Sequence, residues 1–218
     1  MTTGSNYILD PGLVLYLPLH EPDGSSFISR DAYGHVCTSN GALWKPDGRY
    51  FDGVDDFIDV PHHTCQLLNT GGTIMVWFKS GTNMGRIVDK TPDLAGTGGY
   101  ILSCYSQNRV YVRINAGSVI TSAANAVVFG DGNWYHTAGV WNAVGYITIY
   151  VNGRRSGTQG KSGSPGNITT TDDLRIGNRS GTLDRPYDGF IAEVRLHNRA
   201  LMPQEIQKIY LATRWRYR

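Results

Sequence analysis

Short runs of strict two-residue alternation place the tightest limit on the fold of this chain of 218 residues. In residues 109–115, Val110, Val112 and Ile114 alternate with polar and aromatic residues, and residues 146–152 repeat the pattern. Successive side chains of a strand point to opposite faces, so these runs predict half-buried strands of antiparallel sheets. Turn residues bound the other apolar runs, and the full set of predicted strands is 13–17, 51–60, 73–79, 86–90, 100–105, 109–115, 134–142, 146–151, 174–177 and 189–196.

Two local signals complete the fold prediction. Asn152-Gly153 predicts a hairpin, because both central positions of a type I′ turn need a positive φ. Near the carboxyl end, Pro203 suits the first turn of a helix, and Ile206 and Ile209 lie on one apolar stripe through residues 204–212. We therefore predict an all-β domain, a two-sheet antiparallel sandwich with one short C-terminal amphipathic helix.

Composition and charge exclude several classes of function. The chain has 20 Lys+Arg and 18 Asp+Glu, a net charge of +2, which is too balanced for a nucleic-acid-binding domain steered by its overall field. No window approaches ~18 uninterrupted apolar residues, so we expect no membrane insertion, and residues 1–10 lack the segments of a secretion signal. Cys37, Cys65 and Cys104 are widely spaced and odd in number. They predict three reduced thiols, most of them buried, as suits assembly inside a cell.

Glycoside hydrolysis is the first enzymatic function to consider for such a sandwich. It needs two carboxyl groups ~5–9 Å apart, whereas the glutamates, Glu21, Glu193 and Glu205, are at least 12 positions apart in the sequence. Asp55 and Asp59 share a face of the predicted strand but lie roughly 13 Å apart, at ~3.3 Å per residue. We therefore predict a domain that is not an enzyme.

Polar and aromatic side chains on two predicted strands suggest a sugar-binding surface. A sugar site needs a flat aromatic platform and planar hydrogen-bonding groups, and these are supplied, if the two strands are neighbours, by Tyr111, Arg113, Tyr146, Thr148 and Tyr150. The alternative is that this is the half-wet outer side of a sheet, where Tyr and Thr are common. Trp77, Trp134 and Trp141 lie inside apolar runs and are expected in the core.

Acidic residues gather at the ends of predicted strands. Carboxylates and carbonyls at these positions suit the six to eight oxygen contacts of Ca²⁺, and the predicted ligands are Asp52, Asp55, Asp56 and Asp188. The alternative is a solvated turn in which Asp52 and Asp55 cap backbone amides. The spacing matches no self-contained calcium loop.

The last five residues interleave three guanidinium groups with two aromatic rings. Such a segment suits docking on a partner, and the predicted partner-binding residues are Arg214, Trp215, Arg216, Tyr217 and Arg218. The alternative is a frayed, unused end.

Seven segments, in order, carry a family resemblance: Gly12–Pro18, Phe51–Pro61, Thr73–Lys79, Trp134–Val140, Ile149–Gly153, Leu174–Gly177 and Gly189–Leu201. Together they resemble the laminin G-like domains of the concanavalin A-like lectin/glucanase superfamily. The resemblance implies a jelly roll of two antiparallel sheets, often with a calcium ion near a rim, that binds glycans or proteins. His20 and Ala192 stand where the family pattern often has acidic residues, whereas the Asp52, Asp55 and Asp56 positions match it.

The resemblance divides the chain into an N-terminal arm (1–11), a laminin G-like jelly roll (12–212) and a basic aromatic tail (213–218). The ending, residues 204–218, also resembles single-domain laminin G-like proteins of bacteriophages and environmental viruses. We therefore expect a virion surface protein for decoration or adhesion, assembled in the host cytoplasm, that contacts neighbouring copies in a homo-oligomer or capsid lattice, or host glycans. The alternatives are a carbohydrate-binding module of a secreted, extracellular polysaccharide-degrading enzyme, and a glycoside hydrolase or lyase.

Overall fold

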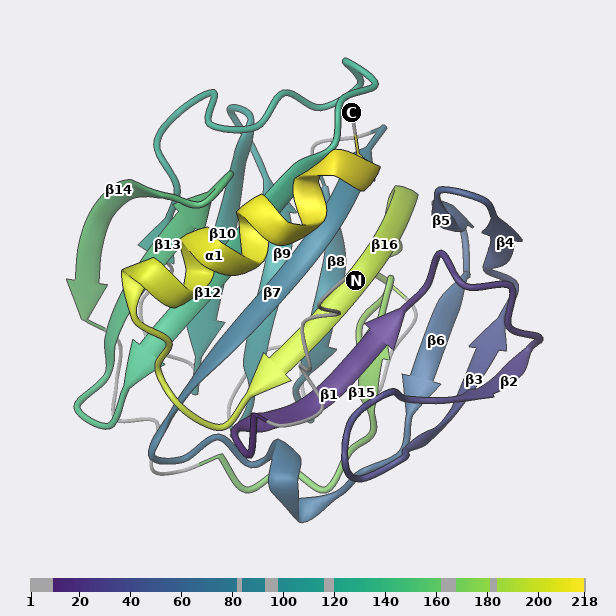
Figure 1. The fold of residues 1–218 in the computed structure, drawn as a ribbon, viewed down its shortest axis with the longest axis horizontal. Coiled ribbons are helices and arrows are strands. Elements are labelled where there is room, and N and C mark those ends of the chain that lie inside the picture. The colour runs from purple at the N-terminus through teal and green to yellow at the C-terminus, as the bar shows by residue number, and fades with distance from the viewer. Residues whose placement is uncertain are drawn as a thin grey trace, which may run out of the picture.

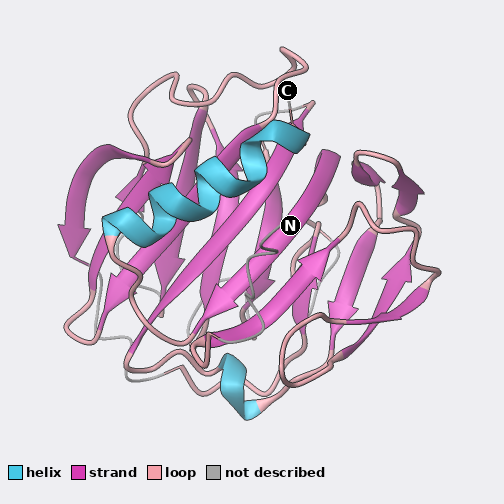
Figure 2. Cartoon of the chain, in the orientation of Figure 1, coloured by secondary structure: helices cyan, strands magenta, loops and turns pink. Residues whose placement is uncertain are grey.

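The computed structural model describes residues 10–81, 84–92, 98–115, 120–161, 168–180 and 184–217. Within these residues, two antiparallel sheets of eight strands each pack face to face, and an α-helix crosses the outer face of one of them (Figure 1, Figure 2). We call the sheet that carries the helix the front sheet and the other the back sheet. The predicted all-β sandwich with a C-terminal helix is confirmed.

The strands follow one another across each sheet in an order far from their order in the sequence. The front sheet runs β14 (Arg154–Lys161), β13 (Tyr146–Val151), β12 (Tyr135–Asn142), β7 (Gly71–Ser80), β16 (Asp188–His197), β5 (Gly48–Asp52) and β4 (Leu43–Lys45), with β1 (Leu13–Pro18) also paired to β16. The back sheet runs β11 (Ile120–Thr121), β10 (Arg109–Ile114), β9 (Tyr100–Tyr105), β8 (Gly85–Lys90), β15 (Leu174–Ile176), β6 (Phe57–Val60), β3 (Val36–Asn40) and β2 (Ser26–Ile28). Among the described residues, the helical elements are η2 (Thr64–Gln66), α1 (Pro203–Thr213) and η4 (Arg214–Arg216).

The main hydrophobic core lies between the two sheets. Val112 and Ile114 of β10 and Ile147 and Ile149 of β13 are buried in it, so the two-residue alternation correctly assigns the inward faces of both strands. Trp141 lies in the same core, as predicted.

The predicted hairpin joins β13 to β14. Asn152 and Gly153 have φ values of 48° and 74°, which is the pair of positive angles that a type I′ turn needs. Asn tolerates this region and Gly adopts it freely, so the local sequence determines the reversal.

Helix α1 packs its apolar stripe on the outer face of the front sheet. It begins with Pro203 in its first turn, as predicted, and Ile206 and Ile209 form a second small core with residues that include Met75 and Tyr150. The middle of the front sheet is therefore covered on both faces, and the surface under α1 is closed to ligands (Figure 1).

The prediction of one strand over residues 51–60 is wrong. The structure divides the run into β5 of the front sheet and β6 of the back sheet, and residues 53–56 cross between them. Gly53 has a φ of 78°, and the Asp52 carboxylate accepts the Val54 amide (2.8 Å). These two features close a turn that Asp and Gly favour, so alternation over this run does not reflect an extended chain.

The beginning of the jelly roll is held to the segment that precedes α1. Asp10 Oδ1 accepts the Gly12 amide (2.8 Å), and Asp10 Oδ2 accepts a hydrogen bond from Arg199 (3.1 Å). Residues 1–9 of the predicted arm lie outside the described residues. Among the residues that are described, no helix has the length and apolar character needed to cross a membrane.

Candidate functional site

The two groups of predicted sugar-binding side chains lie on opposite sides of the sandwich. Tyr111 and Arg113 belong to β10 of the back sheet, whereas Tyr146, Thr148 and Tyr150 belong to β13 of the front sheet. The condition of neighbouring strands is therefore not met, and the five side chains form no common surface. Tyr150 is, in addition, buried beneath α1, with 8% of its surface exposed.

Three of the predicted metal ligands come together at the turn that links the sheets. One carboxylate oxygen each from Asp52, Asp55 and Asp56 lies within 4.8 Å of the other two. Asp56 Oδ2 accepts the Asp52 amide (2.9 Å), so Asp52 and Asp56, rather than Asp52 and Asp55, cap backbone amides here. Burial raises the pKa of Asp56, and the charges of its two neighbours act in the same direction. We call these three residues the acidic cluster.

Asp188, the fourth predicted ligand, is not part of the acidic cluster. It pairs with Asp52 across β5 and β16, but its side chain lies against two glycines. A Cβ atom at Gly53 would lie 2.9 Å from the Asp188 Cβ, and one at Gly81 would lie 2.7 Å from Asp188 Oδ2. The missing side chains of these glycines leave room for the Asp188 carboxylate, which lines the neighbouring pocket instead.

Two adjoining pockets at this end of the sandwich form what we call the rim trough. Their volumes are about 380 Å³ and about 190 Å³, and they share Met84, Gly85 and Arg185. The larger pocket is further lined by Asp52, Gly53, Asp184, Pro186 and Asp188. The smaller is further lined by Arg86, Ser103, Cys104, Tyr105 and Tyr111. The rim trough thus joins two aspartates of the metal prediction to one tyrosine of the sugar prediction.

The aromatic end of the rim trough is held by fixed contacts. The buried Arg86 donates a hydrogen bond to the Tyr111 hydroxyl and pairs with Asp89 (3.3 Å). Tyr105 meets Tyr111 edge to face, with ring centroids 5.4 Å apart. Because Arg86 and Asp89 are buried, they hold the Tyr111 ring at one position on the outer face of the back sheet.

The predicted partner-binding tail folds back on its own domain. Tyr217 is 7% exposed, and its ring centroid lies 4.5 Å from that of Trp77 and 5.1 Å from that of Trp134. Its hydroxyl donates to Glu193 Oε1 (3.0 Å), and Arg216 Nη1 donates to the same oxygen (3.0 Å). Trp77 is buried, as predicted, but in a small separate core with Tyr217 rather than between the sheets. Trp134 is only half-buried and packs against that small core.

The other tail residues differ in exposure. Trp215 is 64% exposed and Arg214 is also exposed, so both remain open to a partner, whereas Tyr217 is closed off. Arg218 lies outside the described residues. The alternative of a frayed end is wrong for residues 214–217, since η4 and the Tyr217 contacts are formed.

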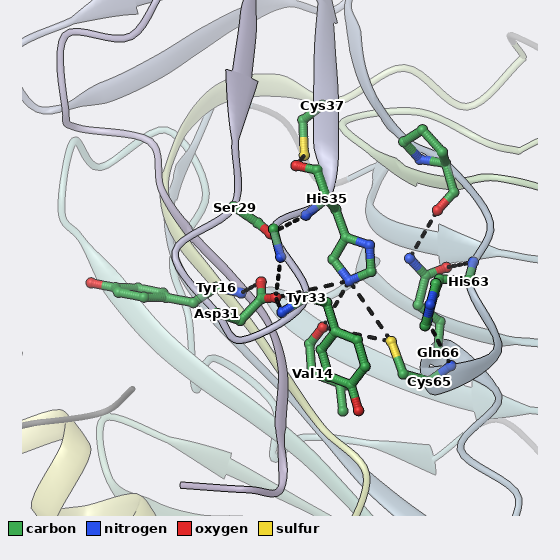
Figure 3. Close-up of polar contacts among 12 residues, drawn as sticks. Val14, Tyr16, Ser29, Asp31, Tyr33, His35, Cys37, His63, Cys65 and Gln66 are labelled. Atoms are coloured by element: carbon green, nitrogen blue, oxygen red, sulfur yellow. Dashed lines mark hydrogen bonds and ion pairs between the residues drawn. The ribbon is translucent and has the colours of Figure 1, made fainter. Parts of the chain in front are cut away.

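The structure shows a polar cluster around His35 and Cys65 that was not predicted from the sequence (Figure 3). Cys65 Sγ lies 3.7 Å from His35 Nε2, and Asp31 Oδ1 lies 4.0 Å from the same nitrogen. Cysteine, histidine and aspartate are the residue types of a nucleophile, a base and an orienting acid. Here, however, Cys65 and Asp31 both approach the same ring nitrogen, His35 Nε2, which also lies 3.0 Å from the Val14 carbonyl oxygen. A catalytic histidine needs its second nitrogen for the acid, so this cluster holds a loop in place.

The cysteines agree with the prediction of reduced thiols. All three are free, and Cys37 and Cys104 are buried, whereas Cys65 is half-buried. Burial raises the pKa of each thiol to about 12. Since the thiolate is the reactive form, none of the three is an activated nucleophile.

Comparisons with known proteins agree with this fold. Residues 52–207, well over half of the chain, match the laminin G model of the concanavalin A-like lectin/glucanases superfamily. A comparison with curated proteins found no match.

Solved structures of botulinum neurotoxins are similar to this chain. One is of type C, whose cell entry depends on interaction with two ganglioside molecules (TM-score 0.68, 13% identity). Another is the binding domain of neurotoxin DC in complex with rat synaptotagmin II (TM-score 0.69, 14% identity), and a third is the serotype G binding domain (TM-score 0.67, 15% identity). Each match covers 92% of this chain and 51% of the toxin chain, so the chain spans about half their length. These identities show the fold, and the family model shows the lineage: the chain is a laminin G-like domain and belongs to the concanavalin A-like lectin/glucanases superfamily.

Proposed function

We propose that this lectin-type domain is a non-enzymatic recognition module that binds a glycan in the rim trough. The observation that carries the proposal is the meeting of aromatic, cationic and anionic groups on one surface, from Tyr105 and Tyr111 through Arg185 to Asp188. Sugars present apolar ring faces to aromatic side chains and hydroxyls to planar polar groups. Ganglioside and protein-receptor binding by toxins of similar fold supports a recognition role.

The donor set of the acidic cluster fits a Ca²⁺ ion within this proposal. Its three carboxylates offer only oxygen ligands within 4.8 Å of one another, which hard divalent cations prefer. Asp56 Oδ2 and Asp52 Oδ1 each accept one backbone amide, which orients these two carboxylates. Because Asp52 lines both the acidic cluster and the rim trough, a bound ion would place a fixed positive charge at the acidic end of the trough.

A glycoside hydrolase or lyase is the enzymatic alternative. Asp52, Asp184 and Asp188 line one pocket. The distance between carboxylates along a single strand therefore no longer argues against catalysis. Asp184, however, pairs with Arg179 (2.9 Å), and Asp52 Oδ1 accepts the Val54 amide, which favours structural over catalytic roles. We expect no release of reducing ends or unsaturated sugars from soluble glucans or galactans. Turnover that disappears in Asp188→Asn would establish the alternative.

A glycan array tests the binding proposal. The wild-type protein is compared with Tyr111→Ala and with Tyr146→Ala, a matched control because Tyr146 is a 43% exposed tyrosine on the other sheet. We expect a set of glycans bound by the wild type and by Tyr146→Ala, and bound about tenfold or more weakly by Tyr111→Ala, as for an aromatic anchor. The absence of any hit, or equal binding by all three proteins, would contradict the proposal.

The biological setting belongs to the same proposal. A virion surface protein, assembled in the host cytoplasm, would contact neighbouring copies through the exposed side chains of Arg214 and Trp215. Sedimentation of the purified chain should then show an oligomer that Trp215→Ala weakens, and a monomer at all concentrations would count against this setting. The secreted binding module of a polysaccharide-degrading enzyme predicts, instead, an extracellular protein encoded with a catalytic domain.

A further inference from the structure

A third pocket lies outside the rim trough, beside the C-terminal segment. We call it the tail pocket. It has a volume of about 490 Å³, and the side chains that matter for its chemistry are Asp47, Lys79, Asn133, Trp134, Asn152 and Tyr217. Trp134 and Tyr217 have no assigned ligand in the proposal above, and none of the six residues lines the rim trough.

The fold assembles the tail pocket from segments that are distant in the sequence. Lys79 lies near the end of β7, and Trp134 directly precedes β12. Asn152 belongs to the β13–β14 hairpin and Asp47 to the turn between β4 and β5, while Tyr217 follows η4. The C terminus lies at the far end of α1, where the helix has crossed the front sheet (Figure 1). The docked tail therefore supplies one wall of the pocket.

One side of the tail pocket is aromatic. Trp134 is half-buried, and its ring centroid lies 5.1 Å from that of Tyr217 and 6.2 Å from that of Phe190. Lys79 Nζ lies 5.3 Å from the centroid of Trp134 and 4.7 Å from that of Phe190. These contacts fix Trp134 on several sides while leaving part of it exposed in the pocket.

Both asparagines of the tail pocket are held by hydrogen bonds within the domain. Asp131 accepts hydrogen bonds from the Asn133 amide and side chain (2.8 Å each) and from the Tyr135 hydroxyl (2.7 Å). Asn152 Oδ1 accepts the His136 amide (3.0 Å). Side chains that are positioned before a ligand arrives lose less entropy on binding, so this arrangement is suited to recognition.

The charges that line the tail pocket decide the class of ligand. Among the described residues that line it, only Lys79 and Asp47 are charged, and their charges are opposite. An acidic ligand would gain from Lys79 but would be repelled by Asp47, and a basic ligand would meet the reverse. A neutral ligand with many hydroxyls uses both groups, together with the two asparagine amides, as donors and acceptors.

We propose that the tail pocket is a second carbohydrate site, which takes a neutral sugar ring against Trp134 and its hydroxyls on Asp47, Lys79 and the two asparagines. The site shares no lining residue with the rim trough, so the two binding proposals can be tested independently of each other. It also gives the docking of Tyr217 a functional consequence, because the tail forms part of the pocket.

An array of immobilised neutral and acidic oligosaccharides, followed by calorimetric titration of each soluble hit, tests the proposal. Trp134→Ala removes the platform. Asp47→Asn, at an exposed position in a turn, replaces an anionic hydrogen-bond acceptor by a weaker neutral one without disturbing packing. Tyr146→Ala is the control, since Tyr146 is an exposed aromatic residue that lines neither the tail pocket nor the rim trough. Tyr111→Ala reports separately on the rim trough.

The proposal expects at least one neutral glycan that Tyr111→Ala and Tyr146→Ala still bind. Trp134→Ala should weaken this binding about tenfold or more, and Asp47→Asn should weaken it in the same direction. If Trp134→Ala does not fold, Asp47→Asn decides the outcome. If binding of every hit depends on Tyr111 alone, the proposal for the tail pocket is overturned and the proposal for the rim trough is supported. The absence of neutral hits, or neutral hits that are insensitive to both pocket variants, would also overturn it.

Discussion

Truncation of Tyr217 tests whether the C-terminal segment is an integral part of the folded domain. The ring is 7% exposed and packs between Trp77 and Trp134, at centroid distances of 4.5 Å and 5.1 Å. Replacing a buried aromatic side chain by Ala costs about 3–5 kcal/mol, because transfer free energy is lost and a cavity remains. We expect Tyr217→Ala to lower the free energy of unfolding by this amount.

Tyr217→Phe separates the hydroxyl from the ring. The Glu193 carboxylate is 2% exposed and accepts hydrogen bonds from Arg195 (2.9 Å), Arg216 (3.0 Å) and the Tyr217 hydroxyl (3.0 Å). The Phe variant leaves the carboxylate with its two guanidinium donors. Its expected cost is about 1.5–3 kcal/mol, the range for one hydrogen bond to a charged group.

Urea unfolding at neutral pH, followed by circular dichroism, measures both costs. Trp215→Ala is the control, because that side chain is 64% exposed and surface substitutions usually change stability by less than about 0.5 kcal/mol. If Tyr217→Ala also changes the free energy of unfolding by less than about 0.5 kcal/mol, the tail is not docked. The wall of the tail pocket would then be absent, and the reasoning for that site would fail.

Three further predictions concern calcium, pH and thiols. Adding about 10 mM Ca²⁺ to chelator-treated protein should stabilise it by about 1.4 kcal/mol if the Kd is near 1 mM, and should raise the Tm by about 3–6 °C. Asp55→Asn should abolish this increase in Tm. An unchanged wild-type Tm would contradict the cation site. Burial lowers the pKa of His136 to about 3 and that of His197 to about 4, so both stay neutral in the folded protein while the unfolded chain protonates them below about pH 6.5. The unfolded state then binds more protons, so the free energy of unfolding should fall by about 2 kcal/mol per histidine as the pH drops from about 7 to 5. The urea midpoint should fall over the same pH range, and it should fall less steeply in His136→Gln. A midpoint that does not change with pH would contradict this account. At pH 8 a disulfide reagent should label the native thiols slowly, with Cys65 first, because burial raises their pKa values to about 12; labelling of all three within seconds would contradict their burial.

Local periodicity predicts the strands and their inward faces but not their partners. The runs at 109–115 and 146–151 are strands with the expected buried sides. Which sheet each strand joins depends on contacts between distant residues, which a local pattern does not contain. For this reason Tyr111 and Tyr146, which look equivalent in the sequence, lie on opposite sides of the sandwich.

The covered outer face of the front sheet explains why Trp77 is buried outside the main core and why the tail docks on its own domain. β7 is buried along nearly its whole length on both faces, and its run of consecutive apolar residues is the signal for burial on both sides. One face meets the main core, and the other carries α1 and the tail. That run indicates that something covers the front sheet, and Trp77 marks the place where Tyr217 docks.

The acidic cluster forms through a turn, whereas the sequence analysis predicted an extended strand through the same residues. The sequence places Asp52, Asp55 and Asp56 near one another simply because they are close in the chain. The turn at Gly53 brings their carboxylates within 4.8 Å, whereas a continuous strand would have spread them over two faces. Asp188 was predicted from its position at the end of a strand, and it lies outside the cluster.

Hydrogen exchange of the domain with and without an array-selected glycan tests the central claim most directly. If the rim trough binds the glycan, amides of β9 and β10 around Tyr105 and Tyr111 should exchange more slowly in its presence, while β13 around Tyr146 should be unaffected. The same pattern should be lost in Tyr111→Ala. Protection confined to β13, or no protection at any concentration that saturates binding, would contradict the assignment of the rim trough as the recognition surface.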